Sequence, residues 1–335
     1  MAENRNAQQV REITDKLEQG LKELFESERF KEYLKTMSKF YNYSFNNTLL
    51  IAMQKPDATL IAGYTAWQRN FDRHVMKGEK GIKILAPAPY KVQEEREKLD
   101  PATQKPVLDK DGKPVTETVE VTRPAFKVVS VFDVSQTDGK ALPDIAVDEL
   151  TGSVENYAAF FDALKELSPV PIAFENITDG AKGYFSHVEN RIAIQEGMSE
   201  IQTIKTAIHE IAHAKLHAVT PGEKVAPEDK KDRRTKEVEA ESVAYTVCQR
   251  YGIETSDYSF GYIAGWSSDK ETKELKGSLE TIRKTAAEMI TGIDEKLKER
   301  LAVKEQEAPT PLRDAGIPVY REAAMYAFEA GKEAI

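Results

Sequence analysis

The chain has 335 residues and a formal net charge of −9, and 40% of its residues are hydrophobic while 31% are charged. This length exceeds the usual size of one domain, so we expect two domains, and the hydrophobic share suffices for packed cores and excludes a low-complexity protein. The single cysteine, Cys248, excludes an internal disulfide, and no apolar run is long enough to span a bilayer, so we expect a cytoplasmic protein.

The charge is distributed unevenly along the chain. Residues 1–140 contain 23 Lys and Arg against 21 Asp and Glu, whereas residues 141–335 contain 24 against 35. The first part is therefore slightly basic and the second part strongly acidic. This asymmetry indicates that the two parts could face different partners.

The first predicted element is a long amphipathic helix over residues 6–38, because its apolar residues recur at the spacing of one helix face. An apolar run at residues 49–53 predicts a second helix, which ends at Pro56. A short helix is expected to open at residues 63–68 and to stop before the turn-forming segment 77–81. The chain therefore begins with a helical module.

Two strands are expected after these helices, at residues 82–87 and 125–132, and we expect them to pair. The segment between them, residues 93–122, is charged and contains three prolines and the turn signal Asp111-Gly112. A segment of this composition predicts a long exposed excursion with a mobile tip.

Cations and aromatic residues concentrate between residues 41 and 91. Six basic residues lie from Arg69 to Lys91 against two acidic residues, and six aromatic residues lie close by in sequence. Single-stranded nucleic acid is held by cations along its phosphates and by aromatic rings under its bases, so the composition allows a DNA-binding surface. The alternative is that the aromatic residues form core and that Lys77–Gly81 is an ordinary surface turn.

Residues 135–152 are rich in turn-forming residues and make the best domain boundary. Beyond them the sequence predicts a helix near 153–167, a strand near 170–175, a hairpin around 184–194, two helices that carry potential metal ligands, and helices near 258–267 and 270–301. Residues 303–312 are typical of a linker. Residues 319–327 resemble the opening of a further module, so the chain could be a fragment of a longer gene product.

Three of the five histidines fall within nine residues, and His209 and His213 frame the pattern HExxH. Residues four apart lie on one face of a helix, so both imidazoles could hold one metal ion while Glu210 stands beside it. The apolar stripe around this pattern predicts a half-buried helix that starts near Ser199. This spacing suits a zinc ion with a water activated by the carboxylate.

A catalytic zinc usually takes three protein ligands, and the next helix offers several carboxylates. Over residues 236–245, Glu237 and Glu241 share one face and Glu239 is turned away. We expect Glu237 to be the third ligand and Glu241 to accept a proton from a ligating imidazole. The alternative is an ordinary solvated acidic face.

His217 is a weaker ligand candidate, because eight helical residues separate it from His209 by about 12 Å along the axis. We expect it to have a structural or supporting role. Cys248 lies eleven residues beyond Glu237 on the same predicted helix, and we expect it to be buried without a chemical role.

The segment Gly197–His213, followed by Glu237–Tyr245, resembles the zincin domain of the ImmA/IrrE-type metallo-endopeptidases carried by mobile elements. In that glutamate-zincin pattern the third ligand is the first residue of an E-x-x-x-D/E unit. The last acidic residue of the unit does not bind the metal but contacts its ligands. The resemblance therefore implies these two roles for Glu237 and Glu241. Glu239 departs from the pattern as an additional candidate ligand.

Four segments of the first part resemble the N-terminal single-stranded-DNA-binding domain of ArdC-type antirestriction proteins. They are Tyr43–Ile51, Gly63–Trp67, Arg73–Ile82 and Val131–Thr137. The resemblance implies DNA handling during conjugative transfer and protection from restriction, and ArdC-type proteins also carry a zincin-like second domain. The candidate DNA-binding residues are Tyr43, Asn46, Asn47, Tyr64, Trp67, Arg69, Arg73, Lys77, Lys80 and Lys83.

Together these observations predict an α+β protein of two domains. Residues 1–140 form an ArdC-like helical module with a β-hairpin or small sheet, residues 150–302 form a glutamate-zincin metallopeptidase domain, and residues 303–335 form a linker and the start of a truncated module. The expected partners are single-stranded DNA and a protein substrate, without a membrane.

The expected function is that of a mobile-element protein that binds single-stranded DNA and hydrolyses peptides with Zn²⁺. Glu210 is the expected catalytic residue, and Tyr262 or His187 could donate to the oxyanion. Two alternatives remain open: a DNA-protecting protein whose zinc is structural and non-catalytic, and a regulatory protease that cleaves a repressor.

Overall fold

The structure is a computed structural model of the chain, and it describes residues 2–307 except positions 102, 111, 143–153, 179, 219–230, 254–257, 259 and 269. Its N-terminal part contains α1 (Ala2–Leu24), α2 (Ser27–Lys39), α3 (Phe45–Gln54), β1 (Ile61–Gly63), α4 (Tyr64–Phe71), β2 (Arg73–Val75), β3 (Ile82–Pro87), β4 (Tyr90–Glu97), β5 (Thr116–Arg123), β6 (Phe126–Asp133), the 3-10 turn η1 (Val134–Gln136) and β7 (Thr137–Gly139). Helices and small sheets are mixed, as the predicted α+β class requires.

The first helical segment is broken, so the prediction of one helix over residues 6–38 is wrong. Glu26 adopts an extended backbone with φ −77° and ψ 137°, and the chain changes direction between α1 and α2. The break buries Phe25 and Phe30 together, with ring centroids 6.1 Å apart. A continuous helix would have left one of these rings exposed, because side chains five residues apart point in different directions.

Strands β1, β6 and β3 form an antiparallel sheet in that order, which confirms the predicted pairing of residues 82–87 with 125–132. The outer edge of β3 is covered by α3, whose amide side chains act like a neighbouring strand. The Asn47 amide both donates to and accepts from the backbone of Leu85, and Gln54 does the same with Lys83. The backbone hydrogen-bonding groups of Lys83 and Leu85 at this sheet edge are thereby paired with two side chains.

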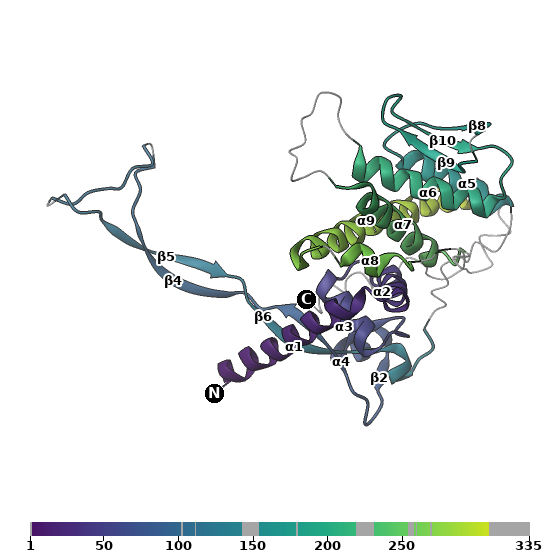
Figure 1. The fold of residues 1–335 in the computed structure, drawn as a ribbon. Coiled ribbons are helices and arrows are strands. Elements are labelled where there is room, and N and C mark those ends of the chain that lie inside the picture. Colours follow the sequence, from purple (N-terminus) through teal and green to yellow (C-terminus); the bar gives the residue numbers. More distant parts are fainter. Residues whose placement is uncertain are drawn as a thin grey trace.

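Strands β4 and β5 pair antiparallel over their whole length and form an arm that extends from the rest of the molecule (Figure 1). The predicted excursion at residues 93–122 is therefore exposed, but much of it is regular strand. The predicted boundary at 135–152 begins too early, because β7 still pairs with β2. Residues 143–152 of that boundary lie outside the described residues.

The C-terminal part contains α5 (Val154–Leu167), β8 (Ile172–Glu175), β9 (Gly183–Ser186), β10 (Arg191–Gln195), α6 (Glu200–His217), α7 (Arg233–Arg250), α8 (Ile263–Ser267) and α9 (Thr272–Glu307). Its sheet has the order β8-β10-β9, with β10 parallel to β8 and antiparallel to β9. The helix predicted near 258–267 is shorter than expected, since only α8 forms in the described part of that segment.

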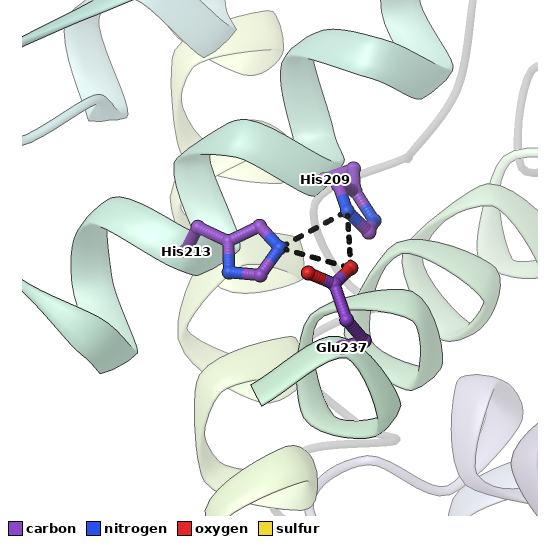
Figure 2. Close-up of side chains that lie close together, drawn as sticks. All are labelled: His209, His213 and Glu237. Carbon is purple, nitrogen blue, oxygen red and sulfur yellow. Dashed lines mark hydrogen bonds and ion pairs between the residues drawn. The ribbon is translucent and has the colours of Figure 1, made fainter. Parts of the chain in front are cut away.

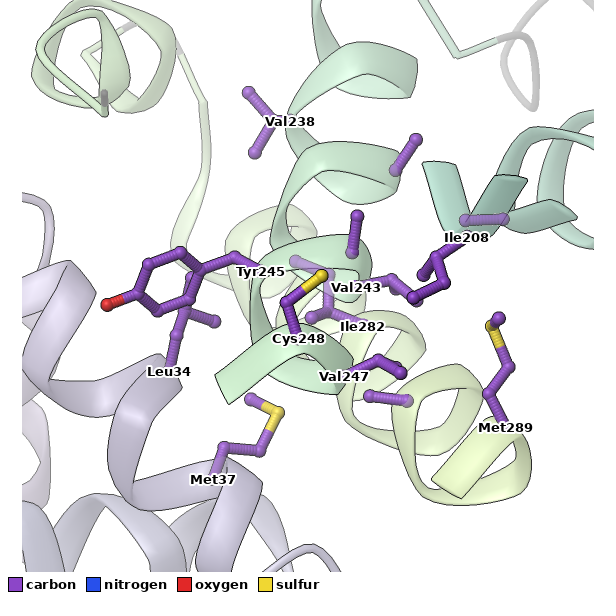
Figure 3. Packing of buried hydrophobic residues seen from close by; sticks show 14 of the residues in the cluster. Leu34, Met37, Ile208, Val238, Val243, Tyr245, Val247, Cys248, Ile282 and Met289 are labelled. Carbon is purple, nitrogen blue, oxygen red and sulfur yellow. The ribbon is translucent and has the colours of Figure 1, made fainter. Parts of the chain in front are cut away.

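The two domains share one hydrophobic core. Helix α2 packs against α7, and Leu34 and Met37 of α2 lie beside Tyr245 and Cys248 of α7 (Figure 3). The ring of Phe30 also lies 5.2 Å from that of Phe260, edge to face. The N-terminal helices therefore belong to the packing of the C-terminal domain as much as to their own, and Cys248 is buried as expected.

Helix α9 continues to Glu307, so residues 303–307 are helical and the predicted linker at 303–312 does not begin where expected. The predicted further module at 319–327 lies outside the described residues. Within the described residues, no helix is both long and apolar enough to cross a membrane.

The shared core predicts that both domains unfold together. Phe30→Ala should cost about 3–5 kcal/mol of stability, because it empties a buried ring site at the domain interface. The two tryptophans serve as probes, since Trp67 is buried in the N-terminal domain and Trp266 is buried in the C-terminal part, where its ring meets Phe25. In denaturant titrations of Trp67→Phe and Trp266→Phe proteins, the transitions should coincide, and Phe30→Ala should shift both.

The matched control is Phe126→Ala, because Phe126 is 51% exposed and its loss should change stability little. Two well-separated transitions, of which Phe30→Ala moves only one, would show that the domains are independent.

Candidate metal centre

Helix α6 presents the HExxH residues toward α7. Its start is fixed by Ser199, whose side chain accepts a hydrogen bond from the backbone N–H of Gln202. Ile204, Ile208 and Ile211 are buried on the core side of the helix. This amphipathic arrangement leaves His209 and His213 on the partly exposed side, one turn apart.

Helix α7 supplies the carboxylate. Its first turn is capped by Asp232, which accepts a hydrogen bond from the backbone N–H of Thr235. This cap sets the phase of the helix, so Val238 and Ala240 face the core while Glu237 faces α6. The predicted helix of residues 236–245 is thus part of a longer helix.

His209, His213 and Glu237 converge (Figure 2). The two Nε2 atoms lie 3.1 Å apart, and Glu237 Oε2 lies 3.7 Å from His209 Nε2 and 3.6 Å from His213 Nε2. A tetrahedral zinc with bonds of about 2.0–2.1 Å separates its ligand atoms by ~3.3 Å. Among the described residues, these three make up the group of potential metal ligands, and their donor atoms fit one divalent ion.

The electrostatics of this cluster also favour a cation. The two histidines hold the pKa of the Glu237 carboxyl far below its usual range. Burial disfavours the charged form of His209, but its interactions with Glu237 and with the charge of Glu210 outweigh burial and raise the pKa of its ring. The cluster therefore attracts positive charge to the point where a metal ion would bind.

Glu210 is buried beside the ligand cluster, with 8% of its surface exposed. Burial raises the pKa of its carboxyl, while the His209 and His213 charges and a hydrogen bond from the backbone of Phe185 in β9 lower it. Gly183 allows β9 to approach this closely, because a Cβ there would lie 2.6 Å from Thr206 Cγ2 and 2.9 Å from the oxygen of Ala193. The carboxylate is thus held in place by the sheet.

A cleft of about 550 Å³ opens at the cluster. It is lined by Gly183, Tyr184, Phe185, His187, His209, Glu210, His213, His217, Lys231, Arg233, Lys236 and Glu237. A smaller cavity of about 340 Å³ adjoins it and shares Gly183, His209 and Glu210. The candidate ligands and Glu210 are therefore accessible to a substrate from one side.

The two candidate oxyanion donors lie in different surroundings. His187 lines the cleft, its ring centroid is 4.6 Å from that of Phe185, and burial lowers the pKa of its ring. The Tyr262 hydroxyl donates a hydrogen bond to Glu241, and burial raises the pKa of this phenol. The predicted role of Glu241 beside a ligating imidazole stays a prediction.

The sequence predicted a structural or supporting role for His217 without naming its partner, and it left Glu239 as an additional candidate ligand. Glu239 is fully buried, and its Oε2 lies 3.1 Å from His217 Nε2. Burial lowers the pKa of the His217 ring. For Glu239, burial acts to raise the pKa of the carboxyl, but the hydrogen bonds from His217 and Lys231 outweigh burial and lower it. The regular i, i+4, i+8 spacing of the three histidines was the only signal that could have pointed to this pair.

Several candidate DNA-binding residues are used inside the fold. Trp67 is fully buried and donates from its indole to the oxygen of Phe132, and Asn47 is occupied by Leu85. Arg73 donates to the backbone oxygens of Thr137 and Lys140, which ties β2 to β7. Tyr43 packs edge to face on Phe40, and burial raises its pKa to about 12.

Other candidates are exposed: Asn46, Tyr64, Arg69, Lys77, Lys80 and Lys83. Tyr64 is 58% exposed, and its ring packs edge to face on Phe132 of β6. Lys83 of β3 donates a hydrogen bond to the hydroxyl of Ser130, which lies on β6 like Phe132. The backbone of Gly81 lies close to both Ser130 and Phe132. Tyr64 and Lys83 thus both contact β6 with their exposed side chains, and we call Tyr64, Lys80 and Lys83 the Tyr64 patch.

Comparison with known proteins finds a matching family model for each part of the chain. Residues 4–132 match the family of the N-terminal domain of anti-restriction factor ArdC, and residues 168–251 match the IrrE N-terminal-like domain. The chain is 30% identical over 322 residues to the uncharacterized protein pXO2-81 of Bacillus anthracis, which covers 87% of this chain and 52% of that protein. It is 34% identical over 148 residues to DNA primase TraC of Escherichia coli, covering 42% of this chain and 12% of TraC. The chain thus spans about half of the first relative and a small part of the second.

Two solved structures are similar to this chain at low identity. The metal-free antirestriction protein ArdC from plasmid R388 aligns with a TM-score of 0.44 at 22% identity, over 78% of this chain and 86% of that one. Its Mn(II)-bound form aligns with a TM-score of 0.44 at 21% identity, over 78% of this chain and 85% of that one.

The ligand geometry predicts a strong effect of removing one donor. His213→Ala and Glu237→Ala should each weaken zinc binding more than about 100-fold, which exceeds the usual effect of changing a residue that only supports a ligand. The affinity is measured by competition with a chromophoric chelator. His74→Ala is the control, since His74 is exposed on β2. Wild-type zinc affinity in His213→Ala would remove the proposed site.

Proposed function

Because this chain joins an ArdC-type N-terminal domain to an IrrE-like domain with a divalent-metal site, we propose that it is a DNA-binding zinc metallopeptidase of a mobile genetic element. The observation that carries the proposal is the convergence of His209, His213 and Glu237 next to the buried Glu210. The proposed domains are residues 1–140 and 150–302, and the proposed compartment is the cytoplasm.

Zinc is the proposed ion, because the two imidazoles belong to an HExxH pattern. Two imidazoles and one carboxylate are the ligands of many catalytic zinc sites, which leave one position open for water. A zinc ion held there would lower the pKa of a bound water to about 7 and polarise a substrate carbonyl. The cleft beside the ligands provides the space for both molecules.

Glu210 is the proposed general base. Its burial raises the pKa of the carboxyl, which strengthens it as a proton acceptor. It would accept the proton of the attacking water and pass it to the leaving amine. The backbone of Phe185 fixes the carboxylate against β9, and His187 at the cleft is the better placed of the two proposed oxyanion donors.

Single-stranded DNA is the proposed ligand of the N-terminal domain, and the Tyr64 patch is its proposed contact. Bases stack on exposed aromatic rings and phosphates pair with neighbouring cations, and Tyr64 with Lys80 and Lys83 offers both. Trp67, Tyr43, Asn47 and Arg73 are occupied inside the fold, so they support this surface instead of touching DNA.

A second candidate function is DNA protection with a non-catalytic zinc. It is favoured by one observation: α7 carries Glu237 on one side and packs against α2 on another, so a bound metal would also stiffen the N-terminal domain. In this case the metal would support the DNA-binding surface, and no peptide would be cleaved.

Glu210→Gln separates these two functions. The variant should keep zinc, because Glu210 is not a ligand, and lose peptide cleavage by about 100-fold or more, because the general base is gone. Cleavage is measured by mass spectrometry on a proteome-derived peptide library with zinc-loaded protein. Glu200→Gln, in the first turn of the same helix, is the control. A Glu210→Gln protein that cleaves like the wild type would contradict the mechanism, and a wild type without cleavage would favour the protective role.

Tyr64→Ala tests the DNA surface. Loss of one stacked base should cost about 1–3 kcal/mol, which is a roughly 5- to 150-fold rise in Kd. Binding is measured by fluorescence anisotropy with a single-stranded oligonucleotide at two salt concentrations, and it should weaken as salt rises. Tyr90→Ala is the matched control, because Tyr90 is 53% exposed on the β4–β5 arm. Equal Kd values for Tyr64→Ala and the wild type would exclude this patch.

A further inference from the structure

A row of polar side chains leads from Lys231 at the edge of the cleft through two buried groups to the metal centre. His217 is 4% exposed and Glu239 is 0% exposed, although neither belongs to the proposed ligand set. Burying an ionisable pair is costly unless each group is hydrogen-bonded. The burial of two ionisable groups beside the proposed ligand His213 therefore needs a physical explanation.

The row begins at Lys231, whose Nζ lies 2.8 Å from Glu239 Oε1 and 2.7 Å from Oε2. Ser278 of α9 also hydrogen-bonds to this carboxylate. Glu239 Oε2 then lies 3.1 Å from His217 Nε2, and His217 Nδ1 lies 3.0 Å from His213 Nδ1. The contacts thus connect a cation, a carboxylate and two imidazoles in one line that ends at a proposed ligand.

The protons along this row can be assigned from its chemistry. A carboxylate can only accept hydrogen bonds, so His217 must donate from Nε2. In a neutral imidazole the other nitrogen is then an acceptor, so His217 Nδ1 accepts from His213 Nδ1. His213 therefore carries its proton on Nδ1, and the lone pair of its Nε2 points toward His209 and Glu237. This is the tautomer that a metal ligand bound through Nε2 requires.

The same contacts exclude His217 as a ligand. Its Nε2 is used by Glu239 and its Nδ1 by His213, so neither nitrogen has a lone pair free for a metal. The residue one turn beyond His209 is His213, itself a proposed ligand, so His209 has no corresponding supporting histidine on α6. The row therefore acts on His213 alone.

We propose that Lys231, Glu239 and His217 form a positioning relay that locks His213 in its Nδ1-protonated tautomer and aims its Nε2 at the metal. This inference rests on the proposed metal site but not on peptidase activity. His217 is a positioning residue, because it acts through His213. Lys231 pairs with Glu239 and keeps it ionised, and the Glu239–His217 contact joins α7 to α6. Residues that orient metal-binding histidines in this way typically change metal affinity 10- to 100-fold.

The tautomer can be observed directly by long-range ¹H–¹⁵N correlation NMR of the histidine rings in the zinc-loaded full-length protein. The expected spectrum shows His213 protonated at Nδ1 with a metal-bound Nε2, and His217 protonated at Nε2 with an acceptor Nδ1. The five histidines are assigned by single substitution. A His217 ring protonated at both nitrogens, or a His213 ring protonated at Nε2, would overturn the proposal.

Zinc affinity of His217 variants provides the second measurement. His217→Phe keeps a ring but removes the acceptor, and it should weaken zinc binding 10- to 100-fold. His217→Gln offers one donor and one acceptor, as the neutral imidazole does, and should recover part of the loss. Zinc affinity in His217→Phe within twofold of the wild type would contradict the relay.

The matched control is Ser242→Ala, because Ser242 is buried in the same helix as Glu239 and its hydroxyl has no hydrogen-bond partner among the described residues. It should leave zinc affinity unchanged. If His217→Phe does not fold, the wild-type spectrum and His217→Gln still decide the matter. A wild type that binds zinc with the expected tautomer but cleaves no peptide would refute the peptidase proposal and leave the relay intact.

Discussion

The packing of α6 against α7 is the constraint on which the rest of the structure depends. It brings two histidines and one glutamate from separate helices to one point, and it buries the Glu239–His217 pair directly behind them. Neither helix can rotate without separating the three donor atoms or exposing the buried pair. The sheet edge β9 then closes the site from the other side, since Gly183 lets its backbone reach Glu210.

This constraint also links the two domains. Helix α7 carries Glu237 on one face and receives α2 on another, so the hydrophobic core is continuous from the N-terminal helices to the metal centre. Inter-domain surfaces within a chain are usually more polar than this and allow relative motion. Here the buried rings of Phe25, Phe30, Phe260 and Trp266 pack across the boundary, and metal binding and the N-terminal domain are expected to stabilise each other.

Much of this arrangement could be predicted from local sequence, and the failures have physical reasons. The HExxH pattern, the cap at Ser199 and the strand pair 82–87 with 125–132 are short-range signals, and the structure has a helix, a cap and a strand pair there. The break at Glu26 was missed because tertiary burial of two phenylalanines overrides a continuous helical pattern. Trp67 and Asn47 were predicted to contact DNA because composition cannot distinguish an exposed side chain from one that is hydrogen-bonded inside the fold. The partner of Glu239 comes from another helix, which no spacing within α7 can indicate.

The central claim is that three side chains from α6 and α7 bind one zinc ion. The most direct test is a crystal structure of the zinc-loaded protein with anomalous data at the zinc absorption edge. The account predicts one anomalous peak about 2.0–2.2 Å from His209 Nε2, His213 Nε2 and a Glu237 oxygen, with an open fourth position toward the cleft. A stoichiometric zinc peak elsewhere, or density at this point that lacks Glu237, would contradict it.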